Sequence, residues 1–141
     1  MADSTHTVEF FWEGGNILND KDRWFKGAGE IYFKTRVTIL GRSANLHTAR
    51  FPKEVYTLHE GPYEINQTLF KGSIQNGEEV LLEVFPIEKD LLDPDDKFVP
   101  YRRRFLRSPE RWAGLYEPGT DSIGDRETMR DWQIRYRVHV S

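Results

Sequence analysis

Carboxylates gathered in two short segments are the side chains of this sequence with the clearest chemical potential. The denser segment, residues 88–96, holds five carboxylates and a single lysine directly after an apolar stretch. The aspartates that could serve as metal ligands are Asp20 and Asp22 in the first segment, and Asp90, Asp93, Asp95 and Asp96 in the second. Ca²⁺ prefers about six to eight oxygen ligands, which clustered carboxylates and loop carbonyls supply. We therefore name calcium as the candidate cofactor, beside the alternative that both segments are simply solvated.

A second group of chemically capable side chains follows the acidic segment. It consists of the arginines Arg102, Arg103, Arg104 and Arg107. A guanidinium presents a planar fork of N–H donors that binds phosphate, lipid headgroups and carboxylates. These arginines are therefore candidates for binding a partner. The alternative, which the negative net charge favours, is that they pair with the acidic segment and with Glu110 and Glu117.

Catalytic signatures are missing from the sequence. The four histidines are scattered without the spacing of a metal site, and the absence of cysteine excludes disulfides and thiolate ligands. No serine stands in a nucleophile-elbow pattern, and Gly27-Ala28-Gly29 lacks the rest of a phosphate-binding loop. We therefore expect a protein that is not an enzyme.

Length and composition set the frame for these groups. With 141 residues, 38% of them hydrophobic, the chain fits one domain with its own core, which we place over residues 1–141. The formal net charge of -3 argues against nucleic acid as a partner. The sequence shows no signal peptide and no run of about 18 apolar residues that could span a membrane. We therefore expect a cytoplasmic location by default.

Alternating apolar and polar residues predict strands in several places. The pattern is clear over 7–12, 30–40 and 132–140, where one face is apolar and the other polar. Residues 80–87 are apolar on both faces, which predicts a central strand that is covered on both sides. Pro86 cannot donate to a ladder, so it should bend or end the pairing locally.

Turn residues divide these strands. Asn76-Gly77 joins two strand-like runs and is a strong hairpin signal, so we expect 66–74 to pair antiparallel with 78–88. Residues 98–130 read as an irregular insertion, apart from a helical turn expected after Ser108-Pro109. Many short strands without a long amphipathic helix indicate an all-β fold, an antiparallel β-sandwich of about eight strands.

The order of these features resembles that of a C2-type calcium/lipid-binding domain. A first strand, Val8–Trp12, leads into the segment with Asp20 and Asp22. GPYEINQTLF at 61–70 is similar to the family's Asn-Pro-x-Trp-Asn-Glu-x-Phe segment, and VLLEVFPIEKDLLDPDDKF at 80–98 resembles its strand followed by an aspartate-rich loop. The resemblance implies a C2-like sandwich that holds calcium at one end, with the six aspartates named above as ligands.

We therefore expect a non-enzymatic, C2-like binding module for an anionic membrane surface or a protein partner. Two alternatives stay open. One is a structural or assembly protein whose sandwich edges and arginine-rich segment 101–111 contact copies of itself or other subunits. The other is a carbohydrate-binding sandwich that stacks sugars on Trp24, Trp112 or Tyr116, against the commoner role of such aromatics in a core.

Overall fold

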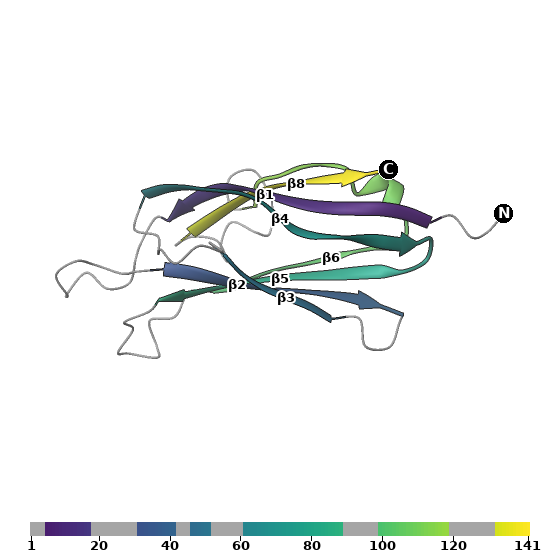
Figure 1. The fold of residues 1–141 in the computed structure, drawn as a ribbon, viewed down its shortest axis with the longest axis horizontal. Helices are drawn as coiled ribbons and strands as arrows, with labels where there is room; N and C mark the ends of the chain where they lie inside the picture. The colour runs from purple at the N-terminus through teal and green to yellow at the C-terminus, as the bar shows by residue number, and fades with distance from the viewer. Residues whose placement is uncertain (1–4, 18–30, 42–45, 52–60, 89–98, 119–131) are drawn as a thin grey trace.

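Eight antiparallel strands form two layers in the computed structural model (Figure 1). The structure describes residues 5–17, 31–41, 46–51, 61–88, 99–118 and 132–141. The strands are β1 (Thr5–Ile17), β2 (Ile31–Leu40), β3 (Leu46–Phe51), β4 (Gly61–Gln75), β5 (Glu79–Glu88), β6 (Tyr101–Phe105), β7 (Gly114–Tyr116) and β8 (Trp132–Val140), and a 3-10 helix, η2 (Pro109–Arg111), lies between β6 and β7. The predicted all-β sandwich of about eight strands is therefore confirmed.

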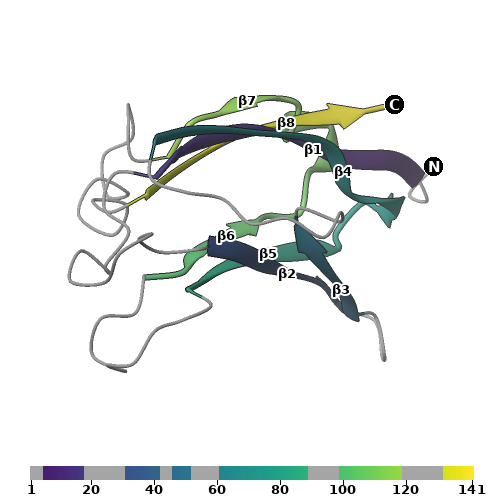
Figure 2. The ribbon, with the colours of Figure 1, turned by 60° about the vertical axis from the view of Figure 1, so that its left-hand side comes forward.

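The two layers are four-stranded sheets. Sheet A has the order β4-β1-β8-β7, and sheet B has the order β3-β2-β5-β6. Figure 2 shows the two sheets stacked face to face, with β1 and β8 side by side in the same layer. These strands pair from Val8–Val140 to Ile17–Trp132, so the regularly alternating last strand is docked into the sheet.

Side chains from both sheets interlock in an aromatic core between the layers. Trp12 of β1 packs against Phe33 of β2 with ring centroids 4.8 Å apart, and Phe33 contacts Trp132 of β8 at 5.3 Å. All three rings are fully buried. Aromatic pairs in such geometries add about 0.5–1.5 kcal/mol each beyond the area that they bury. This cluster therefore ties sheet A to sheet B.

Two glycines let β1 run close to its neighbours at a β-bulge after Trp12. A Cβ atom on Gly14 would lie 2.2 Å from the carbonyl oxygen of Tyr63, and one on Gly15 would lie 2.0 Å from that of Gln133. The Tyr63 hydroxyl donates to the same Gln133 oxygen at 2.8 Å. A residue without a side chain is therefore required where this buried tyrosine crosses the strand.

β5 is an interior strand of sheet B, as the sequence predicts. It pairs with β2 along its whole length but with β6 only over 80–84. Pro86 stays in register with Phe33 of β2. It lies beyond the end of the pairing with β6, so its missing N–H removes no backbone hydrogen bond to β6. The outward side chains Leu81, Phe85 and Ile87 are half-buried, so the predicted cover is complete on one side only.

The predicted hairpin between 66–74 and 78–88 is wrong. The Asn76-Gly77 turn forms, with Gly77 at φ 91° and a hydrogen bond from Glu78 N to Gln75 O at 3.0 Å. However, β4 pairs with β1 in sheet A, whereas β5 pairs with β2 in sheet B. The turn therefore carries the chain from one layer to the other, because both strands bury their apolar side chains from opposite sides of the core.

The segment 98–130, predicted to be irregular, contributes two strands in its described part. β6 and β7 are edge strands of sheets B and A. The expected helical turn forms between them as η2 with Pro109 in its first turn, although Ser108 makes no side-chain capping bond. Val55, Tyr56 and Leu58, whose residue types also suggest a strand, lie outside the described residues. No helix in the part of the chain that the structure describes is long and apolar enough to cross a bilayer.

Candidate anion-binding face

The six aspartates predicted as calcium ligands all lie outside the described residues. They are Asp20, Asp22, Asp90, Asp93, Asp95 and Asp96. Among the described residues, no group of three or more histidine, aspartate or glutamate side chains is arranged to hold a metal ion. Calcium binding therefore remains a sequence-based prediction.

The four arginines predicted to bind a partner do not form one cluster. Along β6, Arg102 and Arg104 point outward from sheet B. Arg103, between them, pairs with the buried residue Leu82 and points inward. Arg107 follows the strand and contacts the same carboxylate as Arg104. The structure therefore places Arg102 and Arg104 on the outer face of β6, with Arg107 beyond the end of the strand, and separates Arg103 from them.

Arg103 contributes to an aromatic cluster at the edge of the sandwich. Its guanidinium lies 4.8 Å from the ring centroid of Tyr116, on which Tyr136 stacks at 5.1 Å with an interplanar angle of 7°. Because the Tyr116 ring is already stacked on Tyr136 and in contact with Arg103, and Trp112 is only 4% exposed, neither ring is open to stack on a sugar as the prediction requires. Trp24, the third residue of that predicted platform, lies outside the described residues.

A buried glutamate on the outer face of sheet B holds two arginines. Glu83 of β5 is 4% exposed, and its carboxylate accepts hydrogen bonds from Nε of Arg36 at 2.7 Å and from Nε of Arg102 at 2.9 Å. Both guanidiniums lie over the Phe85 ring, 5.3 and 5.6 Å from its centroid. The bond from Arg36 outweighs burial and, with the bond from Arg102, lowers the pKa of Glu83. Glu83 is therefore an anion at neutral pH that fixes two cations.

A second glutamate, Glu79, holds two further arginines. Its carboxylate accepts hydrogen bonds from Nε of Arg104 at 2.7 Å and from Nε of Arg107 at 3.3 Å. These bonds, above all the one from Arg104, lower the pKa of Glu79. Ion pairs are thus present, as the favoured alternative predicts, but the carboxylates that the structure shows are those of β5.

The same face continues onto β2 and β3, where it adds Lys34 and Arg50. These two residues line a hollow of about 410 Å³ together with Arg36, Thr48 and Phe85. The Arg50 guanidinium lies 4.4 Å from the ring centroid of Tyr32. Sequence reasoning missed these cations as a site, because the polar side of the alternation over 30–40 is equally typical of a solvated strand.

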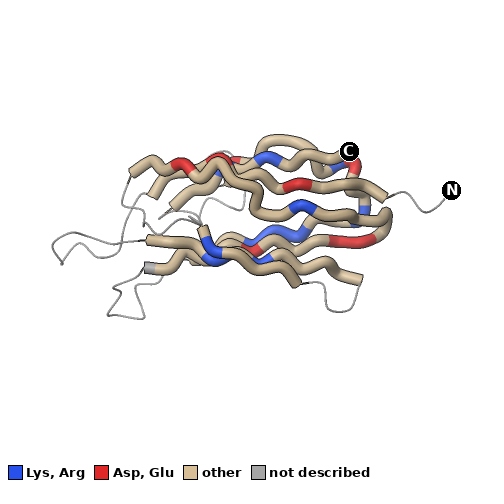
Figure 3. The backbone as a smooth tube through the Cα atoms, in the orientation of Figure 1, with Lys and Arg blue, Asp and Glu red and all other residues tan. Residues whose placement is uncertain are grey.

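The outer face of sheet B carries a surplus of positive charge, and we call it the basic face. By strand register it holds five cations and two carboxylates, Lys34, Arg36, Arg50, Arg102, Arg104, Glu79 and Glu83, a net charge of +3. The whole chain carries a net charge of -3, so the remainder carries about -6. In Figure 3, both sheets carry red and blue segments, and blue segments recur along the strands of sheet B.

The outer face of sheet A is charged but balanced. Within its strands it holds three carboxylates and three cations, Glu9, Glu13, Glu64, Lys71, Arg135 and Arg137. Glu13 accepts hydrogen bonds from Nε of Arg135 at 3.0 Å and from Nε of Arg137 at 3.4 Å. Sheet A thus repeats the arrangement of one glutamate between two arginines without a surplus of either sign.

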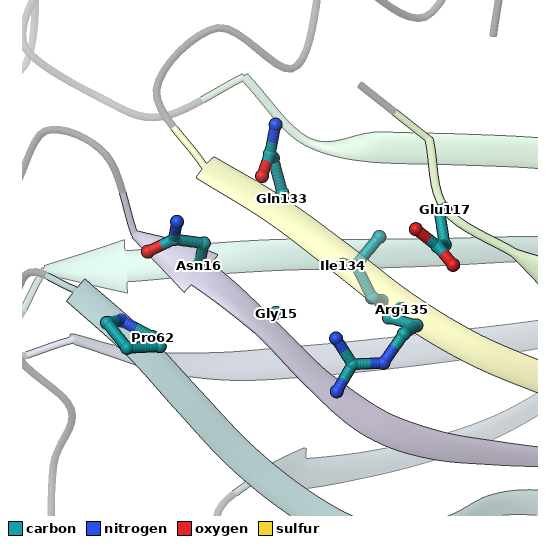
Figure 4. Close-up of a pocket in the computed structure, with 7 residues that line it drawn as sticks. All are labelled: Gly15, Asn16, Pro62, Glu117, Gln133, Ile134 and Arg135. Atoms are coloured by element: carbon teal, nitrogen blue, oxygen red, sulfur yellow. The ribbon is translucent and has the colours of Figure 1, made fainter. Parts of the chain in front are cut away.

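A smaller hollow of about 220 Å³ opens on sheet A near the ends of β1 and β8 (Figure 4). It is lined by Gly15, Asn16, Pro62, Glu117, Gln133, Ile134 and Arg135. Its one carboxylate and one guanidinium balance each other in charge, and the guanidinium is already bonded to Glu13. The basic face is therefore the stronger candidate for recognising a charged partner.

Comparison with known proteins assigns no family to the chain. No protein-family model matches the sequence, and no curated protein matches it. Any functional conclusion must therefore come from the residues of the basic face themselves.

Proposed function

We propose that this protein is a non-enzymatic binding module that docks its basic face on an anionic membrane surface. The observation that carries the proposal is the net charge of +3 on one sheet face of a chain whose total charge is -3. A solvated sheet face needs charged side chains, but it does not need a surplus of one sign. A surplus of cations creates a potential that attracts and orients an anionic partner.

The size of the charge surplus is appropriate for reversible docking. Each Lys or Arg close to an anionic leaflet contributes about 1 kcal/mol. A net charge of +3 therefore provides on the order of 3 kcal/mol before any apolar contact. Salt screens this attraction over a Debye length of about 8 Å at physiological ionic strength. Binding should therefore weaken as salt is added.

Apolar side chains among the cations favour a membrane over an acidic protein. Tyr32, Leu81, Phe85 and Ile87 are half-buried on the basic face, and Leu46 at its edge is 55% exposed. Surfaces that enter a membrane interface combine Lys and Arg with aromatic and aliphatic groups, because the cations meet the headgroups while the apolar groups reach the acyl boundary. The basic face has this composition.

Vesicle sedimentation tests the proposal. We expect the protein to bind vesicles of phosphatidylcholine and phosphatidylserine in EDTA, and not vesicles of phosphatidylcholine alone. Removing Lys34 and Arg50 together (K34A/R50A) should weaken binding by about 2 kcal/mol, or about thirtyfold. The matched control on sheet A, K71A/R135A, should bind like the wild type. Binding that is equal for both double variants, or that occurs only with calcium, would contradict docking through the basic face.

A further inference from the structure

We infer that Glu83, although negatively charged, strengthens the binding of anionic phosphate groups on the basic face by holding Arg36 and Arg102 in position. The inference rests on the proposed function and assigns Glu83 the role of a positioning residue. Its side chain is only 6% exposed, so it does not itself meet a ligand. The residues that it holds are 44% and 54% exposed and do face solvent.

The contacts of Glu83 leave the arginines with donors for a ligand. Each guanidinium bonds the carboxylate through Nε, at 2.7 Å for Arg36 and 2.9 Å for Arg102. A guanidinium has five N–H donors, so a bond through Nε leaves N–H groups at its outer end for phosphate oxygens. The two oxygens of Glu83 are each taken by one arginine, which makes the arrangement symmetric about β5.

Phe85 supplies a second constraint on the same two side chains. Both guanidiniums lie over its ring, at 5.3 Å for Arg36 and 5.6 Å for Arg102. A hydrogen bond and a ring contact together fix the position of each long side chain before a ligand arrives. Ordering these side chains on binding would otherwise cost affinity, so fixing them in advance favours the bound state.

The convergence of the two side chains defines the kind of ligand. Arg36 and Arg102 stand on the two strands that flank β5, so their backbones are about 10 Å apart. Their guanidiniums converge on the two oxygens of one carboxylate and on one ring, so the free N–H groups of both can bind the oxygens of one phosphate group. The inferred ligand is therefore the phosphate group of a membrane headgroup, with the other cations of the basic face next to neighbouring headgroups.

The variant Glu83→Gln separates positioning from simple charge attraction, because the two explanations predict opposite changes in vesicle affinity. The variant makes the basic face more positive by one charge, so attraction alone predicts tighter binding to phosphatidylserine vesicles. A glutamine has one acceptor oxygen in place of two, so at least one of Arg36 and Arg102 loses its bond. We expect binding about fivefold weaker than that of the wild type, which corresponds to one lost charge-assisted contact.

Glu13→Gln on sheet A is the matched control. It makes the same change of charge and releases a similar pair, Arg135 and Arg137, on the other face. We expect its vesicle affinity to equal that of the wild type or to exceed it slightly. As a readout of position, the Nε–H signals of Arg36 and Arg102 should exchange slowly with water in the wild type and rapidly in Glu83→Gln.

A second variant covers the case in which Glu83→Gln does not fold. The double variant R36K/R102K keeps the charge and the carboxylate but removes the forks, and it should also bind about fivefold more weakly. Unchanged or tighter binding of either folded variant would overturn the inference. Inorganic phosphate at constant ionic strength should not displace the vesicles, and displacement would overturn the assignment to membrane headgroups in favour of free phosphate.

The outcomes also separate this inference from the proposed function. If the wild type does not bind phosphatidylserine vesicles, or if K34A/R50A binds as well as the wild type, the proposed function fails. If those results are as expected but Glu83→Gln binds more tightly, only the positioning role of Glu83 fails.

Discussion

The outer faces of the two sheets share one arrangement of charges, a glutamate bonded to two arginines, but they differ in net charge. On sheet A, Glu13 lies between Arg135 and Arg137, and on sheet B, Glu83 lies between Arg36 and Arg102. Around Glu13 the other charges cancel, whereas the basic face keeps a net charge of +3. An ion-paired arginine is therefore not in itself a sign of function. The distinguishing feature is the number of cations on the basic face beyond those that its glutamates neutralise.

The two glutamates also differ in burial. The Glu83 side chain is 6% exposed, and that of Glu13 is 25% exposed. A carboxylate removed from water depends more strongly on its partners, because water no longer compensates for a lost hydrogen bond. The same substitution should therefore have unequal effects on the two faces.

The largest expected effect is on stability, in the pair Glu83→Ala and Glu13→Ala. Glu83→Ala removes two hydrogen bonds between charged groups from a nearly buried position and should lower the free energy of unfolding by about 3 kcal/mol. Glu13→Ala should lower it by about 1 kcal/mol or less. Urea unfolding monitored by tryptophan fluorescence measures both values. Equal losses would mean that burial does not distinguish the two ion-paired groups.

A charge reversal on each face gives the next largest effect. Lys34→Glu changes the charge of the basic face by two units and should weaken binding to phosphatidylserine vesicles by about 2 kcal/mol, or about thirtyfold. Lys71→Glu makes the same change on sheet A and should leave the affinity nearly unchanged. Vesicle titrations at low and at physiological salt measure both affinities. A similar loss for both lysines would show that total charge, and not the face, governs binding.

Calcium tests the sequence-based hypothesis for the acidic segments. A ligand that binds only the folded protein at ten times its Kd stabilises it by about 1.4 kcal/mol, which corresponds to a rise in melting temperature of several degrees. We expect this rise when calcium replaces EDTA, and its loss when Asp93 and Asp95 are changed to Asn. An unchanged melting temperature would show that these segments do not load with calcium.

The smallest effect is a difference in acid stability between the wild type and Glu83→Gln. The folded-state pKa of Glu83 lies below its ordinary value of 4.5, so its contribution is complete above about pH 4.5 and is lost as the pH falls through the folded-state pKa. We expect the wild type to lose stability more steeply below that pH than Glu83→Gln. Urea unfolding over a pH series measures the slopes, and parallel curves throughout would contradict a lowered pKa.

Local sequence patterns predict much of this fold, because successive side chains of a strand point to opposite faces and so produce an alternation of apolar and polar residues. The alternation over 30–40 and 132–140 identifies β2 and β8, and the apolar run at 80–87 identifies β5 as an interior strand. The same patterns do not say which strands pair. Asn76-Gly77 encodes a tight turn, but whether that turn closes a hairpin or crosses between layers depends on contacts with distant strands.

The candidate site is less accessible to sequence reasoning. The sequence pattern does not reveal β6, because Arg103 occupies an inward position that an apolar residue would normally fill. The guanidinium of Arg103 packs on the ring of Tyr116, which lies outside β6 in the sequence. The basic face combines residues of four strands whose order is not visible in the sequence. Arg36 and Arg102 stand 66 positions apart and meet on Glu83 and Phe85 of β5.

The chain has no cysteine, so a single introduced cysteine reports which face meets a membrane. Thr48 is exposed on the basic face, and Thr7 is exposed on the outer face of sheet A. We would attach an environment-sensitive fluorophore to Thr48→Cys or to Thr7→Cys and add phosphatidylserine vesicles in EDTA. The proposed function predicts a blue shift and a rise in emission at position 48 with little change at position 7. A response at position 7 alone, or equal responses at both positions, would contradict docking through the basic face.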